Sequence, residues 1–395
     1  MKKIVSLALT AAMALALLAG CAAPTAAPAA PAATEAPAVT EAPAPAAAEP
    51  APAEEPAEEP WEPVTLKVGF MGKGIKPVGV IVAMAKGFYE EEGIIIDAQK
   101  VSSMNDAYLA VSKGDLDIYL FSSTAAATFI SQGTTTLRVF GGTASEGSEI
   151  MCDVNSDLKL DTLADFLGKT VACMMPETGQ MVLKSALLDA GYTIGGPDDK
   201  ADVTFVYFSD TNAAIEGCKK GEYDCCITNS VMGFYAEQMG VRVEAAVKDF
   251  VPAYPCCRQT CYEGTYLNNF DALVRFEIAT IRGHEYYKNT DNMEEVLDIL
   301  QEFTDGQDRE YLKAQVYGTE NYTPVMRLTL DPDKKACVAF YQAMANIGEI
   351  EDRVDVDWND YVVTDVYSTA LQTLLEREPD NALYKEMQEY FLANN

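Results

Sequence analysis

Histidine is almost absent from this 395-residue chain, in which His284 is the only one. The chain therefore has little of the side chain most often used as a general base or as a metal ligand. Basic residues are also few, with 29 Lys and Arg against 60 Asp and Glu and a net charge of −31. This balance argues against binding to DNA or RNA, because a nucleic-acid site needs a basic surface. Neither a nucleophile elbow nor a phosphate-binding loop occurs, and we expect no catalytic residue, no cofactor and no metal ion.

Long apolar runs are missing after residue 20. The run at residues 4–18 follows Lys2 and Lys3, an arrangement typical of a signal peptide. It is shorter than the roughly 20 residues that a membrane-spanning helix needs. It leads into LAGC at positions 18–21, which resembles the bacterial lipobox. The resemblance implies that residues 1–20 are a lipoprotein signal peptide and that the lipidated Cys21 anchors the chain to the membrane.

Residues 21–63 consist mostly of Ala, Pro and Glu and contain no basic residue. Such a segment cannot bury a core, so we expect a disordered, extended tether. A tether of this kind suits a Gram-positive cell, where the protein stands off the outer face of the cytoplasmic membrane.

The sequence KGDLDIYLFSST at positions 113–124 is echoed by KGEYDCCITNS at positions 220–230. Both copies place an aspartate three residues after the first glycine, and both reach a second glycine after 19 residues, at Gly133 and Gly240. Each copy is typical of a helix stop, a buried strand and a polar helix start. We expect Asp117 to bond within its own turn rather than to a ligand. The repeat predicts two lobes of similar α/β build.

The rest of the chain fits a two-lobe division. We expect residues 64–147 and 255–395 to form lobe 1, with a mostly helical C-terminal part, and residues 148–254 to form lobe 2. The chain then crosses twice between the lobes, which predicts a hinge and an interlobe cleft.

Three segments resemble one family: AKGFYEEEGI at 85–94, GDLD at 114–117 and DFLGKTV at 165–171. They are similar to runs in the ABC-importer solute-binding proteins for nitrate, alkanesulfonates, taurine and bicarbonate, and in the thiamine-pyrimidine-binding proteins. The resemblance implies a type II periplasmic-binding-protein fold. It also implies a monomer that captures a small solute and delivers it to an ABC permease and its ATPase.

Four polar loop tips are expected to face the cleft, each at the start of a helix, where free N–H groups attract an anion. Together with a cleft arginine that would pair with an oxyanion, they predict a site for a nitrate-, sulfonate-, taurine- or carboxylate-like ligand. The predicted ligand-binding residues are Gly72, Lys73, Ser122, Ser123, Thr124, Glu177, Thr178, Thr228, Asn229, Ser230 and Arg258.

Several alternatives stay open. Aromatic residues near the tips would allow stacking on a heterocycle such as a thiamine-precursor pyrimidine. The run CCRQTC at 256–261 could bind iron or zinc, form a disulfide, or hold reduced thiols, and nine cysteines remain besides Cys21. An extracellular sensor lipoprotein, or a cysteine- and iron-dependent enzyme, would be a different class of function.

Overall fold

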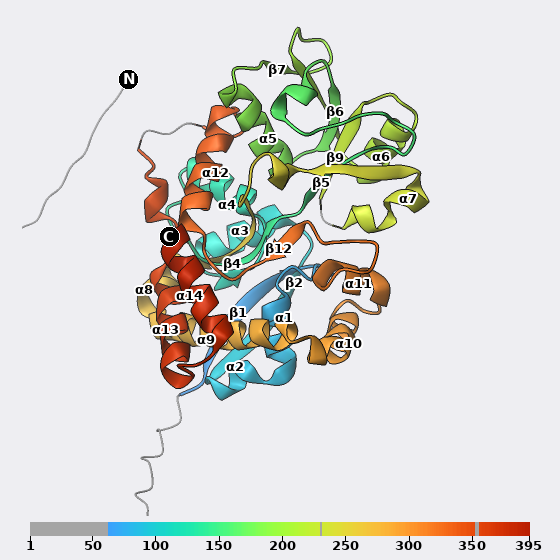
Figure 1. Cartoon of the computed structure of the whole chain (residues 1–395). Coiled ribbons are helices and arrows are strands. Elements are labelled where there is room, and N and C mark those ends of the chain that lie inside the picture. Colours follow the sequence, from blue (N-terminus) through green and yellow to red (C-terminus); the bar gives the residue numbers. More distant parts are fainter. Residues whose placement is uncertain (1–61, 230, 352–354) are drawn as a thin grey trace, which may run out of the picture. The chain divides into compact units, whose positions relative to one another are not determined.

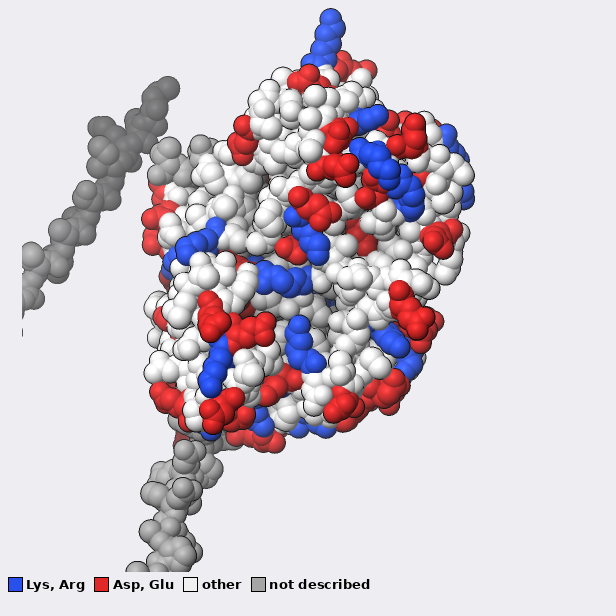
Figure 2. Space-filling view, viewed as in Figure 1, with Lys and Arg blue, Asp and Glu red and all other residues white. Residues whose placement is uncertain are grey.

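A computed structural model of the chain describes residues 62–229, 231–351 and 355–395. The signal peptide, Cys21, nearly all of the tether and Ser230 lie outside the described residues, so what the sequence indicates about them stays a prediction. The described residues belong to one compact unit that contains two six-stranded sheets flanked by helices (Figure 1). On the face shown in Figure 2, acidic side chains are spread widely and lie among basic ones.

The first sheet has three neighbouring parallel strands and an antiparallel set beside them. β1 lies between β2 and β3 with both pairings parallel, whereas β11 runs antiparallel to β3 and β4, and β12 runs antiparallel to β4. In spatial order the strands are β12 (Met326–Leu328), β4 (Leu137–Glu146), β11 (Pro255–Tyr262), β3 (Ile118–Tyr119), β1 (Val64–Met71) and β2 (Ile94–Val101).

The second sheet repeats this plan. Its parallel strands are β7, β8, β6 and β9, and β5 joins them antiparallel to β9, with β10 antiparallel to β5 at the edge. In spatial order the strands are β10 (Val241–Ala246), β5 (Ser148–Asp153), β9 (Cys225–Asn229), β6 (Thr170–Met174), β8 (Val203–Phe208) and β7 (Ile194–Gly195). Thus β5 lies antiparallel beside β9, the strand of the second repeat copy, as β11 lies antiparallel beside β3, the strand of the first.

The internal repeat predicted from the sequence is confirmed. Gly114, Gly133, Gly221 and Gly240 all have positive φ, at 77°, 97°, 72° and 79°, a conformation that glycine adopts without steric cost. The two copies diverge after their strands. In the first copy a regular helix begins at Ser123, whereas the second copy continues into a 3-10 turn that begins at Met232.

The two equivalent aspartates have the same structural role. Asp117 Oδ2 accepts the Lys67 N–H at 2.9 Å, and Asp224 Oδ2 accepts the Thr170 N–H at 2.8 Å. Asp117 therefore bonds to the neighbouring parallel strand, not within its own turn as we expected. Each aspartate thus holds the strand that follows it, β3 or β9, in register with the neighbouring parallel strand, β1 or β6.

The helices follow the sequence periodicity, and one of them, α9, packs along α1, α2 and α13. Within the described part of the chain, no helix combines the length and apolar character needed to cross a bilayer. The α-helices are α1 (Val78–Lys86), α2 (Phe88–Glu91), α3 (Met104–Lys113), α4 (Ser123–Ser131), α5 (Thr178–Asp189), α6 (Thr211–Lys219), α7 (Ala236–Met239), α8 (Glu263–Asn268), α9 (Phe270–Lys288), α10 (Met293–Phe303), α11 (Arg309–Val316), α12 (Lys334–Asn346), α13 (Asp365–Arg377) and α14 (Ala382–Asn394). The 3-10 turns are η1 (Leu163–Phe166), η2 (Met232–Tyr235), η3 (Val247–Asp249), η4 (Thr290–Asn292) and η5 (Trp358–Asp360).

The predicted lobe boundaries fall where the chain passes from one sheet to the other. The first crossing lies between β4 and β5, and the second between β10 and β11 (Figure 1). The C-terminal segment contributes β12 to the first sheet, but α12 also packs against α5 of the second half. The division into two moving lobes with these boundaries stays a prediction.

We expect Gly283→Ala to destabilise the fold, because α9 approaches α1 closely at this residue. A Cβ there would overlap the carbonyl oxygen of Gly79 and lie 2.8 Å from the Ala83 nitrogen. Overpacking of this kind costs about 1–3 kcal/mol. Urea unfolding should show that loss, and Gly79→Ala, whose nearest contact would be 3.2 Å, should cost less. Equal unfolding midpoints for wild type and Gly283→Ala would contradict the close approach.

Candidate functional site

A cavity of about 140 Å³ lies between the two sheets, at the carboxyl ends of their parallel strands. This is where ligands bind in open α/β sheets. Its walls come from both halves of the chain and from both crossings. The lining residues are Met71, Lys76, Met104, Phe121, Ser122, Thr124, Glu146, Ser148, Pro176, Glu177, Thr178, Asn229, Cys256 and Cys257.

Two helix starts reach the cavity, and each is capped by a side chain of its own. Ser122 has a φ of 52° and caps α4 by accepting the Ala125 N–H at 3.3 Å. Glu177 caps α5 by accepting the Gln180 N–H at 2.7 Å, and its carboxyl group also accepts the hydroxyl of Ser148. Burial raises the pKa of Glu177, although these two hydrogen bonds act in the opposite direction.

A lysine and two cysteines form a second polar group in the cavity wall. Lys76 Nζ lies 3.2 Å from Cys256 Sγ, and the sulfurs of Cys256 and Cys257 lie 3.7 Å apart. The hydrogen bond from the Cys257 thiol, together with the charge of Lys76, holds the pKa of Cys256 well below its usual range. Burial is the largest single influence on Lys76 and acts to lower its pKa, but Cys256, Cys257 and Glu177 together outweigh it and raise that pKa. The arrangement favours a thiolate on Cys256 beside the ammonium group of Lys76.

The cavity brings together five of the residues predicted from the sequence: Ser122, Thr124, Glu177, Thr178 and Asn229. That these residues bind a ligand stays a prediction.

The other predicted residues do not line the cavity. Ser123 and Thr228 are buried and are not among its lining residues. Gly72 and Lys73 are exposed, and Lys73 makes a long ion pair with Asp305 at 3.9 Å. Ser230 lies outside the described residues.

The prediction for Arg258 is wrong in its location. The guanidinium is fully buried in the first half of the chain and does not line the cavity. It donates to Asp333 Oδ2 at 3.2 Å, to Ser145 Oγ at 3.0 Å and to the carbonyl oxygens of Ala144, Cys257 and Pro332. A guanidinium with this many partners has no donor left for a ligand.

Sequence reasoning missed Lys76, Glu146 and Ser148, and it left Cys256 and Cys257 open between a metal site, a disulfide and reduced thiols. All nine cysteines of the described residues are free thiols. Among those residues, no group of three or more His, Cys, Asp or Glu side chains is arranged to hold a metal ion. Lys76 could have been found, because it lies three residues after Lys73, which we expected to face the cleft.

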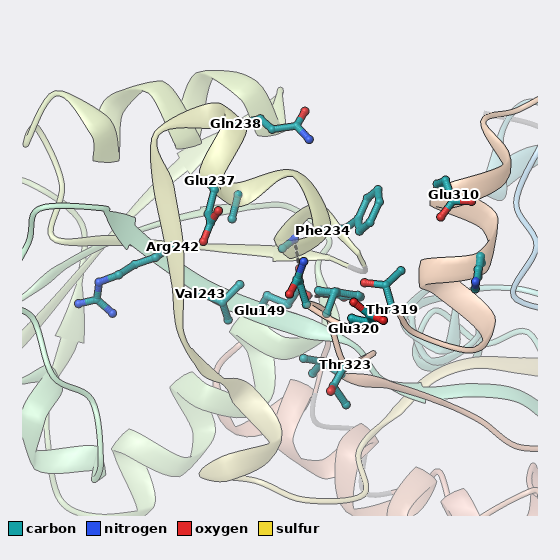
Figure 3. A pocket seen from close by; sticks show the side chains of 16 residues that line it. Glu149, Phe234, Glu237, Gln238, Arg242, Val243, Glu310, Thr319, Glu320 and Thr323 are labelled. Carbon is teal, nitrogen blue, oxygen red and sulfur yellow. Dashed lines mark hydrogen bonds between the residues drawn. The ribbon is translucent and has the colours of Figure 1, made fainter.

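A larger hollow of about 1110 Å³ lies beside η2, α7 and β10 on one side and α11 with residues 319–325 on the other. In Figure 3, Phe234 points into it, whereas Arg242 points away. The buried Glu149 accepts the Tyr322 hydroxyl at 2.6 Å and the Gly233 N–H at 2.7 Å. Tyr235 stacks on Tyr311 with ring centroids 5.3 Å apart. These contacts connect the two halves of the chain at this hollow.

Residues 76–293, more than half of the chain, match the family model described as NMT1/THI5 like. The chain belongs to the NMT1/THI5 like family. The family expected from the three sequence segments is therefore confirmed. No curated protein matches the chain significantly.

Solved structures support the fold. The periplasmic nitrate-binding protein NrtA from Synechocystis PCC 6803 aligns with a TM-score of 0.62 at 16% identity, over 81% of this chain and 92% of that one. The periplasmic aliphatic sulphonate binding protein SsuA from Escherichia coli aligns with a TM-score of 0.57 at 16% identity, over 76% and 92%. The desulfurization enzyme DSZB aligns with a TM-score of 0.50 at 16% identity, over 78% and 99%. The predicted periplasmic-binding-protein fold is confirmed, but the fold is shared by binding proteins and an enzyme.

We expect Arg258→Ala to lower stability, because the buried carboxylate of Asp333 then loses its ion pair with the buried guanidinium. Breaking a buried ion pair costs about 3–5 kcal/mol. The partly exposed Arg327, also 3.2 Å from Asp333 Oδ2, is the matched control, and Arg327→Ala should cost less. Both losses are measured by urea unfolding. An Arg258→Ala variant as stable as wild type would contradict the structural role.

Proposed function

We propose that this chain is the solute-binding component of an ABC importer. In this proposal a small solute binds between the two halves and is then delivered to a permease and its ATPase. The observation that carries the proposal is the cavity at the carboxyl ends of the strands, lined from both sheets by hydroxyl, amide and carboxyl groups. Membership of the NMT1/THI5 like family and the fold shared with NrtA and SsuA support it.

The cavity suits a small, polar solute. At about 140 Å³ it is smaller than the roughly 300–1,000 Å³ typical of sites for drug-sized ligands. Ser122, Thr124 and Thr178 supply hydroxyl groups, and Asn229 supplies an amide. The side chains of Met71, Met104, Phe121 and Pro176 supply apolar walls. This combination orients a ligand by a few hydrogen bonds while excluding water from the rest of its surface.

The charges of the cavity favour a ligand with hydrogen-bond donors over nitrate or an alkanesulfonate. Glu146 and Glu177 line it, and Lys76, the cavity's lysine, is already paired with Cys256. The Ala125 and Gln180 N–H groups, which could have held an anion, are occupied by the capping side chains. We therefore rank a zwitterion such as taurine, or an amino-substituted heterocycle such as a thiamine-precursor pyrimidine, above a simple anion.

Two other functions would use the same fold. An extracellular sensor would bind the solute without a permease, so a permease and ATPase encoded beside the gene favour the importer. An enzyme would turn its ligand over, and incubation with a bound candidate followed by product analysis separates it from a binding protein.

A thermal-shift screen with nitrate, bicarbonate, taurine, alkanesulfonates and aminopyrimidines tests the proposal. A ligand at 100 times its Kd should stabilise the protein by about 2.7 kcal/mol. Calorimetric titration with the best ligand should then show a loss of about two- to twelvefold in affinity for Asn229→Ala, because one hydrogen bond contributes roughly 0.5–1.5 kcal/mol. Thr228→Val is the matched control, since this neighbouring residue is buried and does not line the cavity. Unchanged affinity in Asn229→Ala and reduced affinity in Thr228→Val would place the ligand elsewhere.

We also propose that Cys21 carries the lipid anchor of the mature protein. Cys21→Ala should release the protein into the medium or leave it with its signal peptide attached. Membrane fractionation and mass measurement of the N-terminus distinguish these states. A Cys21→Ala protein that matures normally and still fractionates with membranes would contradict the anchor.

A further inference from the structure

Cys256 differs from the other cysteines of the described chain. It is half-buried, whereas the other eight are buried, and of the two cysteines that line the cavity it is the more exposed. A sulfur in this position can be reached by a small molecule that enters the cavity. Cysteine side chains react with electrophiles as thiolates. The protonation state of the Cys256 sulfur therefore decides whether such a molecule can react with it.

The groups around Cys256 favour the thiolate. Lys76 approaches from the loop between β1 and α1, with its Nζ 3.2 Å from Sγ. Cys257, the next residue of β11, places its own sulfur 3.7 Å away and can donate its proton. Arg258 adds a positive charge from the first half of the chain, while Glu177 acts in the opposite direction from the start of α5. Two further titratable side chains, Tyr254 and Glu146, lie near Cys256 at the crossings. The pKa of Cys256 is held well below that of an ordinary thiol by Cys257 and Lys76.

We propose that Cys256 is a thiol-modification site, at which a low-molecular-weight disulfide entering the cavity forms a mixed disulfide with the protein. The Cys256 thiolate attacks one sulfur of the disulfide. The sulfur–sulfur bond of the reagent breaks as the new one forms, and the second sulfur leaves with the electron pair and takes a proton from water. Cys256 is thereby oxidised and the departing sulfur is reduced, so no further oxidant is needed.

The adduct would occupy the cavity. At about 140 Å³, the space cannot hold both a thioalkyl group on Cys256 and a solute in contact with Ser122 and Asn229. Modification would also remove the charge that Lys76 pairs with, leaving a half-buried ammonium group without its partner. This consequence rests on the proposed function, because it treats the cavity as the solute site. Solute capture would then be switched off by disulfides and restored by thiols.

The experiment uses the full chain, reduced and then exposed to 2-hydroxyethyl disulfide, with each modified cysteine located by peptide mass mapping. Cys256 should react faster than any other cysteine of the folded protein, and the midpoint of its rate against pH should lie below about 8.5, the value for a free thiol. Lys76→Met should raise that midpoint and slow the reaction at pH 7 by about tenfold. Lys67→Met removes an exposed lysine outside the cavity and serves as the matched control.

If Lys76→Met does not fold, Cys257→Ala is the second variant, since removing the thiol donor should also raise the midpoint. The inference is overturned if Cys256 reacts no faster than the buried cysteines, or if its midpoint matches that of a free thiol. A Cys256 that reacts as expected while taurine or aminopyrimidine binding persists in the adduct would contradict the proposed ligand site instead. A protein that binds its solute but leaves Cys256 unmodified would overturn only the present inference.

Discussion

Hydrogen bonds of Tyr254 link the two segments that cross between the sheets. Its hydroxyl accepts the Ser148 N–H at 3.0 Å, and its carbonyl oxygen accepts the Glu146 N–H at 2.9 Å. The neighbouring Ala253 N–H bonds to the Glu146 carboxylate at 3.0 Å. Since these bonds join the first crossing to the second, they fix the spacing between Ser148 and Cys256, which stand on opposite crossings and line the same cavity. The site therefore depends on a connection between the sheets and not on either sheet alone.

The strand that follows the first crossing divides its side chains between two hollows. Ser148 lines the small cavity and bonds to Glu177, whereas Glu149, the next residue of β5, lines the large hollow and bonds to Tyr322. This alternation is the two-residue period of a β-strand. One face of β5 thus serves the candidate ligand site, while the other holds the two halves in contact. A change in the relative position of the halves would therefore alter the contacts on both faces of β5.

The features that sequence reasoning found are those set by local chemistry. The paired glycines need positive φ and the paired aspartates hold adjacent strands, so both kinds of residue recur at fixed spacing. Arg258 could not be placed in this way, because β11 changes register around Cys257 and breaks the alternation that would have set the side-chain direction. The bulged strand turns Arg258 into the core and leaves Cys256 at the cavity. Lys76 and Cys256 are 180 residues apart, and a single sequence contains no signal that joins them.

The Lys76–Cys256 pair also limits what the cavity can bind. An ammonium group withdrawn from water needs a compensating charge nearby, and the Cys256 sulfur, whose pKa is held low, lies 3.2 Å from Lys76 Nζ. An incoming anion would compete with that sulfur for Lys76, and it would approach Glu146 and Glu177 as well. A ligand that donates hydrogen bonds would leave the pair intact and could use both carboxyl groups. The pairing that prepares Cys256 for reaction is thus the same one that makes the cavity unsuited to a simple anion.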